Sequence, residues 1–250
     1  MDQTGGGELS LSPNGLDKLR EMQRLAGRAY YSASILDEIV SLRDFEQGDI
    51  REFQQLAYRP RLEAEMFNDP ATVMDLVFGE IGRSIALSEE RAIVTKIAEL
   101  TVQGSPANDN FVAIVQAVTR LLAEGGSPSL ILAPVDYYMT WHWDWATRHS
   151  EGPGFRFIQD SGRSYLQVGS FPPIRVRWSN KYVPFDDFYV IDRGWGEWVA
   201  KPDRGHRFQV RFLERNELDY AYKVVFRLDI IDPSRVLRII PNRIGLRQRA

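Results

Sequence analysis

The stretch from Phe111 to Tyr138 most constrains the fold, because it joins a helix pattern, a strand pattern and a second helix start in a fixed order. Asp109 or Asn110 can cap the first helix, and Gly125-Gly126 stands where that helix would end. Its apolar side chains recur at helical spacing: Val112, Val115, Val118, Leu121 and Leu122. The run SPSLILAP follows, which is too short for a helix and typical of a central strand, and Asp136 is placed to begin the next helix.

The segments before this stretch are predicted to be helical. Residues 15–43 carry apolar side chains at three- and four-residue steps, and Pro70 is placed in the first turn of another helix. Within that second helix, we expect a kink or break at the small residues Gly79, Gly82 and Ser88.

The chain after residue 150 has a different pattern, with turn residues at short intervals and alternating apolar and polar side chains. The candidate strands are 155–158, 165–168, 173–178, 188–192, 196–200, 206–213 and 220–230. Helices followed by strands favour an α+β fold over alternating βαβ units.

Composition narrows the class of protein further. The chain has 250 residues and no cysteine, which excludes disulfides, thiolate metal sites and a cysteine nucleophile. Residues 1–100 carry 11 Lys and Arg against 18 Asp and Glu, whereas the remainder carries 20 against 16. No apolar run reaches the length of a membrane span, and the Gly- and Ser-rich start lacks the pattern of a signal peptide. We therefore expect no membrane partner, and we expect residues 1–15 to form a flexible arm.

Catalytic and metal-binding patterns are weak in this sequence. His142 and Asp144 stand two residues apart, whereas a helical metal site needs a spacing of three or four. The adjacent acids Glu89-Glu90 and Asp186-Asp187 are better explained as solvated faces or helix caps than as an acid–base pair. There is no GxSxG elbow and no phosphate-binding loop. We predict no catalytic residue, no cofactor and no metal ligand.

Two groups of tryptophans are candidates for binding or packing. Stacking on a ligand, packing in the core and contact with another subunit are all open for them, and aromatic residues dominate the last two environments. The candidate interface residues are Trp141, Trp143, Trp145, Trp195 and Trp198.

The C-terminal residues are basic and lie beyond the last acid, Asp232. They could neutralise phosphates of a nucleic acid, or they could form a solvated terminus. The candidate polyanion contacts are Arg243, Arg247 and Arg249.

The order of these elements resembles the major capsid proteins of tailed phages and the encapsulins, which share one fold. The resemblance covers about residues 70–240 and rests on SEERAIVTKIAEL, the helix that starts at Phe111 and stops at Gly125-Gly126, SLILAPVDYY, YLQVGSFPPIRV, NKYVPFDDFYVIDRGWGEWV and the closing strands ending in IIDPSRVLRI. It implies that the helix from Phe111 is a long spine helix, and it implies a peripheral domain and an axial domain near symmetry axes. It also implies an extended loop over a neighbouring subunit. Residues 44–70 occupy the position of that loop in the chain, but this segment is shorter than the family's extended loop.

The resemblance implies an N-terminal arm and helix at 1–43, a connecting segment or reduced extended loop at 44–70, and capsid-like peripheral and axial domains at 71–250. It further implies a structural subunit, not an enzyme, that assembles with itself into a closed icosahedral-type shell, either a phage capsid or an encapsulin-like nanocompartment. Nucleic acid or cargo protein would be enclosed through the charged termini, in a virion or a cytoplasmic particle. The alternatives are another virion component, such as a connector or tail subunit, and an enzyme with an aromatic-lined site.

Overall fold

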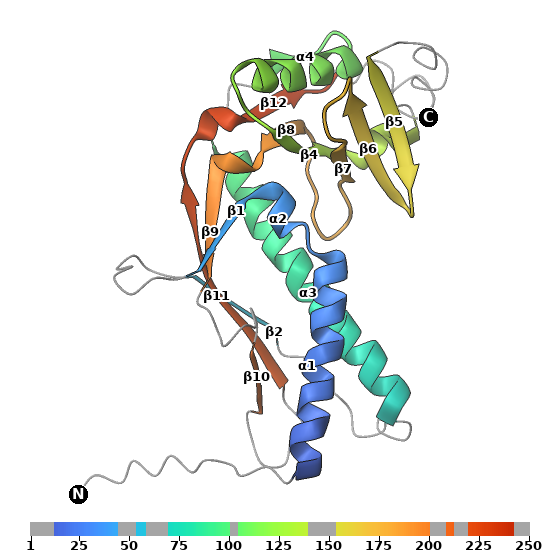
Figure 1. Cartoon of the computed structure of the whole chain (residues 1–250), viewed down its shortest axis with the longest axis vertical. Coiled ribbons are helices and arrows are strands. Elements are labelled where there is room, and N and C mark those ends of the chain that lie inside the picture. The colour runs from blue at the N-terminus through green and yellow to red at the C-terminus, as the bar shows by residue number, and fades with distance from the viewer. Residues whose placement is uncertain are drawn as a thin grey trace, which may run out of the picture. The chain divides into compact units, whose positions relative to one another are not determined.

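The computed structural model describes residues 13–44, 54–58, 70–100, 105–139, 154–200, 209–212 and 220–242 (Figure 1). The chain divides into two compact units, each assembled from three separate segments. One contains Met1–Ser34, Leu56–Ala86 and Phe208–Val224, and the other contains Ile35–Gln55, Leu87–Arg207 and Val225–Ala250. Helices and two mixed sheets are both present, so the predicted α+β class is confirmed.

In the first unit, two helices pack together. They are α1 (Pro13–Ala33) and the first part of α3 (Pro70–Glu99), and Ala26 and Tyr30 of α1 are fully buried. A Cβ atom built on Gly82 of α3 would lie 2.0 Å from the carbonyl oxygen of Ala26 and 2.9 Å from the backbone nitrogen of Tyr30. The absence of a side chain at Gly82 therefore lets the two backbones touch.

The same glycine was one of three small residues expected to kink or break α3, and the expected break is absent. The helix runs without interruption through Gly79, Gly82 and Ser88. With 30 residues it is also longer than α4 (Asn110–Ala123, 14 residues), the segment predicted to be the long spine helix. Gly82 serves helix packing, which outweighs the modest cost of a glycine inside a helix.

The second unit is built on a seven-stranded sheet. Its strand order is β3-β12-β8-β4-β7-β6-β5, with β4 parallel to β7 and antiparallel to β8. The strands are β3 (Ser105–Pro106), β4 (Pro128–Ala133), β5 (Phe155–Asp160), β6 (Arg163–Val168), β7 (Ile174–Trp178), β8 (Phe188–Asp192) and β12 (Val236–Ile240). The apolar run SPSLILAP thus forms the central strand, as predicted.

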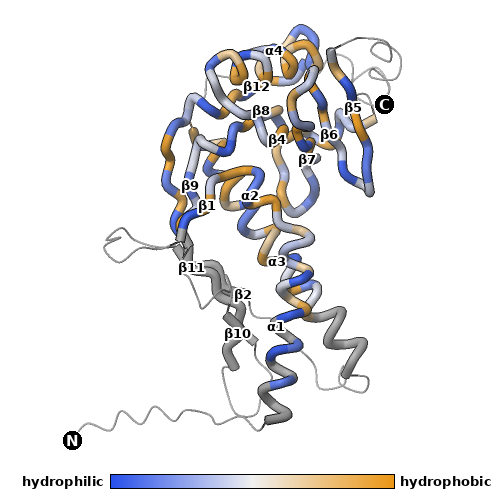
Figure 2. The backbone as a smooth tube through the Cα atoms, in the orientation of Figure 1, coloured by the Kyte–Doolittle hydropathy of each residue, from blue (hydrophilic) through white to orange (hydrophobic). Residues whose placement is uncertain are grey.

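Helix α4 covers one face of this sheet (Figures 1 and 2). The Asp109 side chain caps its first turn by accepting hydrogen bonds from the backbone N–H groups of Phe111 and Val112. Gly125, with φ of 78°, ends it in the left-handed region that favours glycine. Its buried residues join an apolar cluster with inward-facing strand residues, among them Ile114, Val118, Leu121, Ile131, Ile174, Val176 and Val190.

The other sheet contains β1 (Ser41–Asp44), β9 (Gly196–Ala200), β11 (Tyr220–Ile230) and β10 (Gln209–Phe212) in that order, with β2 (Gln54–Tyr58) pairing to β11. The helix predicted over 15–43 ends at Ala33, and a short helix α2 (Leu36–Ile39) and strand β1 follow. Strand β1 lies parallel to β9, with Ser41 opposite Glu197. A local pattern does not reveal this pairing, because its partner lies about 150 residues further along the chain.

Two arginines of strand β7 lie on the face of the sheet opposite α4. Arg175 and Arg177 stand two residues apart and share a face, while Val176 between them joins the apolar cluster. The Arg175 Nη1 donates to both carboxylate oxygens of Glu38 in α2, at 2.6 and 2.8 Å. Arg177 forms a two-pronged pair with Glu90 of α3, at 2.8 Å for each bond. Both arginines therefore join helices to the sheet.

The carboxylate that pairs with Arg177 is removed from water, whereas the Glu38 side chain is 31% exposed. The Glu90 side chain is 2% exposed and Glu89 is also buried, so the prediction that these two acids are solvated is wrong. Arg177 supplies the compensating charge that a buried carboxylate requires. For Glu38, burial raises the carboxyl pKa above its ordinary value, and this effect exceeds the opposing attraction of Arg175.

Replacing Gly82 with alanine should destabilise the protein strongly. The added methyl group would overlap the backbone of α1, and we expect a loss of about 3 kcal/mol or more in the free energy of unfolding. Gly79→Ala is the matched control, because no described atom lies within 4 Å of a Cβ there, and it should gain about 0.5–1 kcal/mol. Urea denaturation followed by circular dichroism measures both, and equal effects would contradict the backbone contact.

Truncating Arg177 should also be costly, because it leaves the buried Glu90 carboxylate without this partner. We expect Arg177→Ala to lose about 2–3 kcal/mol, allowing for the partial exposure of the arginine. The exposed pair between Arg120 and Glu124 provides the control, and Arg120→Ala should cost about 0.5 kcal/mol or less. Denaturation curves of the two variants would refute the argument if their midpoints moved equally.

Candidate assembly surfaces

Buried Asp192 fixes one end of the seven-stranded sheet. Its carboxylate accepts hydrogen bonds from the backbone N–H of Ser127 at 2.7 Å and of Gly194 at 2.9 Å. Arg235 completes the set through a 2.9 Å ion pair. One carboxylate thus joins the start of β4 to two short 3-10 helices, η3 (Arg193–Trp195) and η4 (Pro233–Arg235).

A second pair connects β12 to the start of β8. Arg238 donates from its Nε to Asp187 at 2.7 Å, and this bond raises the pKa of the guanidinium. Asp187 is largely buried, which corrects the expectation of a solvated acid at this position. Together with Asp192, this pair ties the strand ends of the sheet to their neighbours.

Two of the predicted interface residues lie inside the protomer. Trp195 and Trp198 are 0% and 1% exposed, and the indole N–H of Trp195 donates to the carbonyl oxygen of Ile39 at 2.6 Å. Their side chains have no exposed area with which to contact a second subunit. Core packing therefore replaces the interface interpretation for these two residues.

The other predicted residues lie outside the described part of the chain: Trp141, Trp143, Trp145, Arg243, Arg247 and Arg249. The histidine candidate His142 lies outside it as well. Among the described residues, no group of three or more His, Cys, Asp or Glu could hold a metal ion. None of the helices described here is both long enough and apolar enough to cross a membrane.

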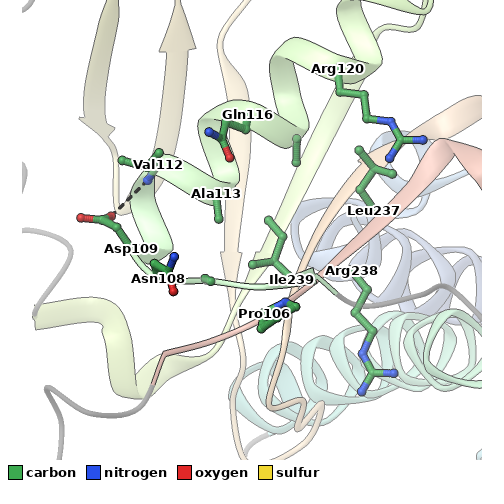
Figure 3. A pocket seen from close by; sticks show the side chains of 12 residues that line it. Pro106, Asn108, Asp109, Val112, Ala113, Gln116, Arg120, Leu237, Arg238 and Ile239 are labelled. Carbon is green, nitrogen blue, oxygen red and sulfur yellow. Dashed lines mark hydrogen bonds between the residues drawn. The ribbon is translucent and has the colours of Figure 1, made fainter.

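A groove of about 370 Å³ lies between α4, β3 and β12 (Figure 3). Its apolar lining includes Val112, Ala113 and Leu237. Its charged residues already have partners, since Asp109 caps α4, Arg120 pairs with Glu124 and Arg238 pairs with Asp187. The lining is therefore mixed, and sequence patterns did not predict the groove.

Exposed apolar side chains also follow two strands of the same unit. Val135 and Met139 follow β4, and Tyr182 follows β7, and all three are more than half exposed. These positions were not singled out by the sequence, because their exposure depends on where the paired strands end. Single exposed apolar side chains are normal on a folded surface, whereas contiguous patches of them mark contact sites.

No protein-family model and no curated protein matches the chain. The structure is nevertheless similar to a virus-like particle protein from Pyrococcus furiosus, with a TM-score of 0.58 and 10% sequence identity over 89% of this chain and 99% of that one.

Two further solved structures are similar. The SrpI encapsulin from Synechococcus elongatus has a TM-score of 0.54 and 12% identity, covering 96% of this chain and 91% of its own. The capsid protein of a native gene transfer agent particle has a TM-score of 0.51 and 13% identity, covering 86% and 89%. These likenesses confirm the fold that the element order resembled. The chain has the α+β fold of encapsulins and capsid proteins.

Proposed function

We propose that this protein is a structural subunit that assembles with itself into a closed shell, as a phage capsid or an encapsulin-like compartment. The observation that carries the proposal is the extent of the likeness, which spans 89% of this chain and 99% of the virus-like particle protein. Both chains therefore share a whole subunit and not one common motif. A subunit of this kind has a structural role, and its main partner is itself.

The ion pairs of the second unit support a rigid building block. Arg175, Arg177 and Asp192 each connect the seven-stranded sheet to a separate element. Such connections hold α2, α3 and η4 in fixed positions on the sheet, and a rigid subunit suits a closed assembly because every copy repeats the same contacts around symmetry axes.

We assign residues 1–43, with α1, to an N-terminal arm and helix, and residues 71–250 to the peripheral and axial domains. Within 71–250, the axial role falls to the seven-stranded sheet with α4, and the peripheral role to α3 and the longer strands. Residues 44–70 then take the place of a reduced extended loop, in which β2 pairs with β11. The particle would be a virion or a cytoplasmic compartment that encloses nucleic acid or cargo protein.

Purified protein should form closed particles much larger than the 28.7 kDa protomer. Analytical ultracentrifugation and negative-stain electron microscopy would detect them, with and without co-expressed neighbouring genes as possible scaffold or cargo. Rings or tubes would favour a connector or tail subunit instead. A small discrete species under every condition would refute the proposal.

Removing residues 243–250 should leave assembly intact and reduce the nucleic acid or cargo retained by the particles. A truncation that starts at Pro241 would be less clean, because the Asn242 backbone N–H donates to Asn110 at 2.7 Å and its side chain donates to Asn108 at 2.9 Å. The basic residues removed are Arg243, Arg247 and Arg249.

The measurement is the absorbance ratio of the particles at 260 and 280 nm, together with its dependence on salt, since phosphate contacts weaken as salt rises. Replacing the same three arginines with glutamine, at full length, separates charge from chain length. Failure of the truncated protein to assemble would show that the tail is architectural.

A further inference from the structure

Two neighbouring loops leave the seven-stranded sheet at the same end. Strands β4 and β7 are parallel, and Ala133 stands opposite Trp178 in their register. The segments that follow are residues 134–139, here the β4 loop, and residues 179–187, here the β7 loop. Because parallel strands end at the same edge of a sheet, these loops emerge side by side.

Backbone hydrogen bonds join the two loops. The Ser179 N–H donates to the carbonyl oxygen of Ala133 at 2.9 Å, and the Val135 N–H donates to the Ser179 hydroxyl at 2.9 Å. In the β7 loop, the Asn180 side-chain oxygen accepts from the N–H groups of Tyr182 and Val183, at 2.8 and 3.0 Å. The conformation is thus fixed before any partner arrives, which lowers the entropic cost of binding.

The side chains of these loops divide into an inward and an outward set. Tyr137 packs its ring against Phe188, and Tyr138 packs against Trp178, each at 5.1 Å between ring centroids. The outward set is apolar and solvent-exposed, at 51% for Val135, 74% for Met139 and 55% for Tyr182. Apolar and aromatic side chains on a preorganised surface are the usual anchors of protein interfaces.

The charges around this surface point to a second copy of the chain as its occupant. The β4 loop carries the exposed acid Asp136. The β7 loop carries the exposed base Lys181, whose Nζ lies 4.7 Å from the Tyr182 ring centroid, and the exposed acid Asp186 five residues further along. Asp187, at the far end of the β7 loop, is already paired with Arg238. If the β4 loop of one copy meets the β7 loop of the next, opposite charges face each other across an apolar contact.

We propose that Val135, Met139 and Tyr182 form the contact between successive copies around a rotation axis, with Asp136 of one copy facing Lys181 of the partner subunit. If the β4 loop of one copy meets the β7 loop of the next and not the reverse as well, the contact is heterologous, and such a contact generates a ring when the rotation between copies closes. This inference rests on the proposed shell function, in which such a ring is a part of the closed assembly.

The first test replaces the apolar anchors with acids. Met139→Asp combined with Tyr182→Asp should lower the yield of particles by about tenfold or more, since interface anchors carry much of the binding free energy. The matched control is Phe171→Asp, which changes a 48% exposed residue in the connection between β6 and β7, at the opposite end of β7. Circular dichroism establishes that each variant is folded. Normal assembly of the double variant, or equal loss in the control, would overturn the proposal.

The second test uses the absence of cysteine from the chain. In a protein with Asp136→Cys and Lys181→Cys, oxidation of assembled particles should give a ladder of covalent multimers on a non-reducing gel, because a disulfide forms only between closely placed Cα atoms. If only the monomer band is present after oxidation, the proposed contact is wrong. If the wild-type protein forms particles while both tests fail, only the loop contact is wrong, whereas absence of wild-type particles refutes the shell function.

Discussion

The second unit depends on the charge requirement of strand β7. Arg175 and Arg177 face the side of the sheet opposite α4, and an arginine there must have an anionic partner to offset its lost hydration. Glu38 of α2 and Glu90 of α3 meet this requirement from two elements that are distant in sequence. The sheet thus has an apolar face that requires only a matching shape and a polar face that requires particular partners at particular positions.

These two requirements together specify the register of β7. Side chains alternate along a strand, so a slip of one residue would place Arg175 and Arg177 in the apolar cluster under α4 and move Val176 to the polar face. Neither arginine would then reach its glutamate. A buried ion pair is weak evidence for added stability, but here it excludes the alternative register through the cost of an unpaired buried charge.

Local patterns predicted the parts of the fold that have local causes. The helix from Asn110, its Asp109 cap and its end at Gly125 follow from neighbouring residues, and so do the alternating strands after residue 150. The errors share a different cause. Strand β1 forms because β9 pairs with it, Gly82 is needed because α1 lies against it, and Glu90 is buried because Arg177 reaches it. Each depends on a partner that sequence periodicity does not identify.

The exposed side chains of the β4 and β7 loops also depend on contacts that sequence periodicity does not identify. Nothing in the sequence separates Tyr137 and Tyr138, which pack inward, from Tyr182, which is displayed to solvent. The separation arises from the parallel pairing of β4 and β7 and from the Ser179 and Asn180 hydrogen bonds that fix the turns. A surface that must repeat many times in one assembly gains from this arrangement, because every copy presents the same side chains in the same geometry. Strand β7 therefore contributes twice to the surface. Its ion pairs fix its position in the sheet, and the hydrogen bonds at its end fix the loops that display the exposed side chains.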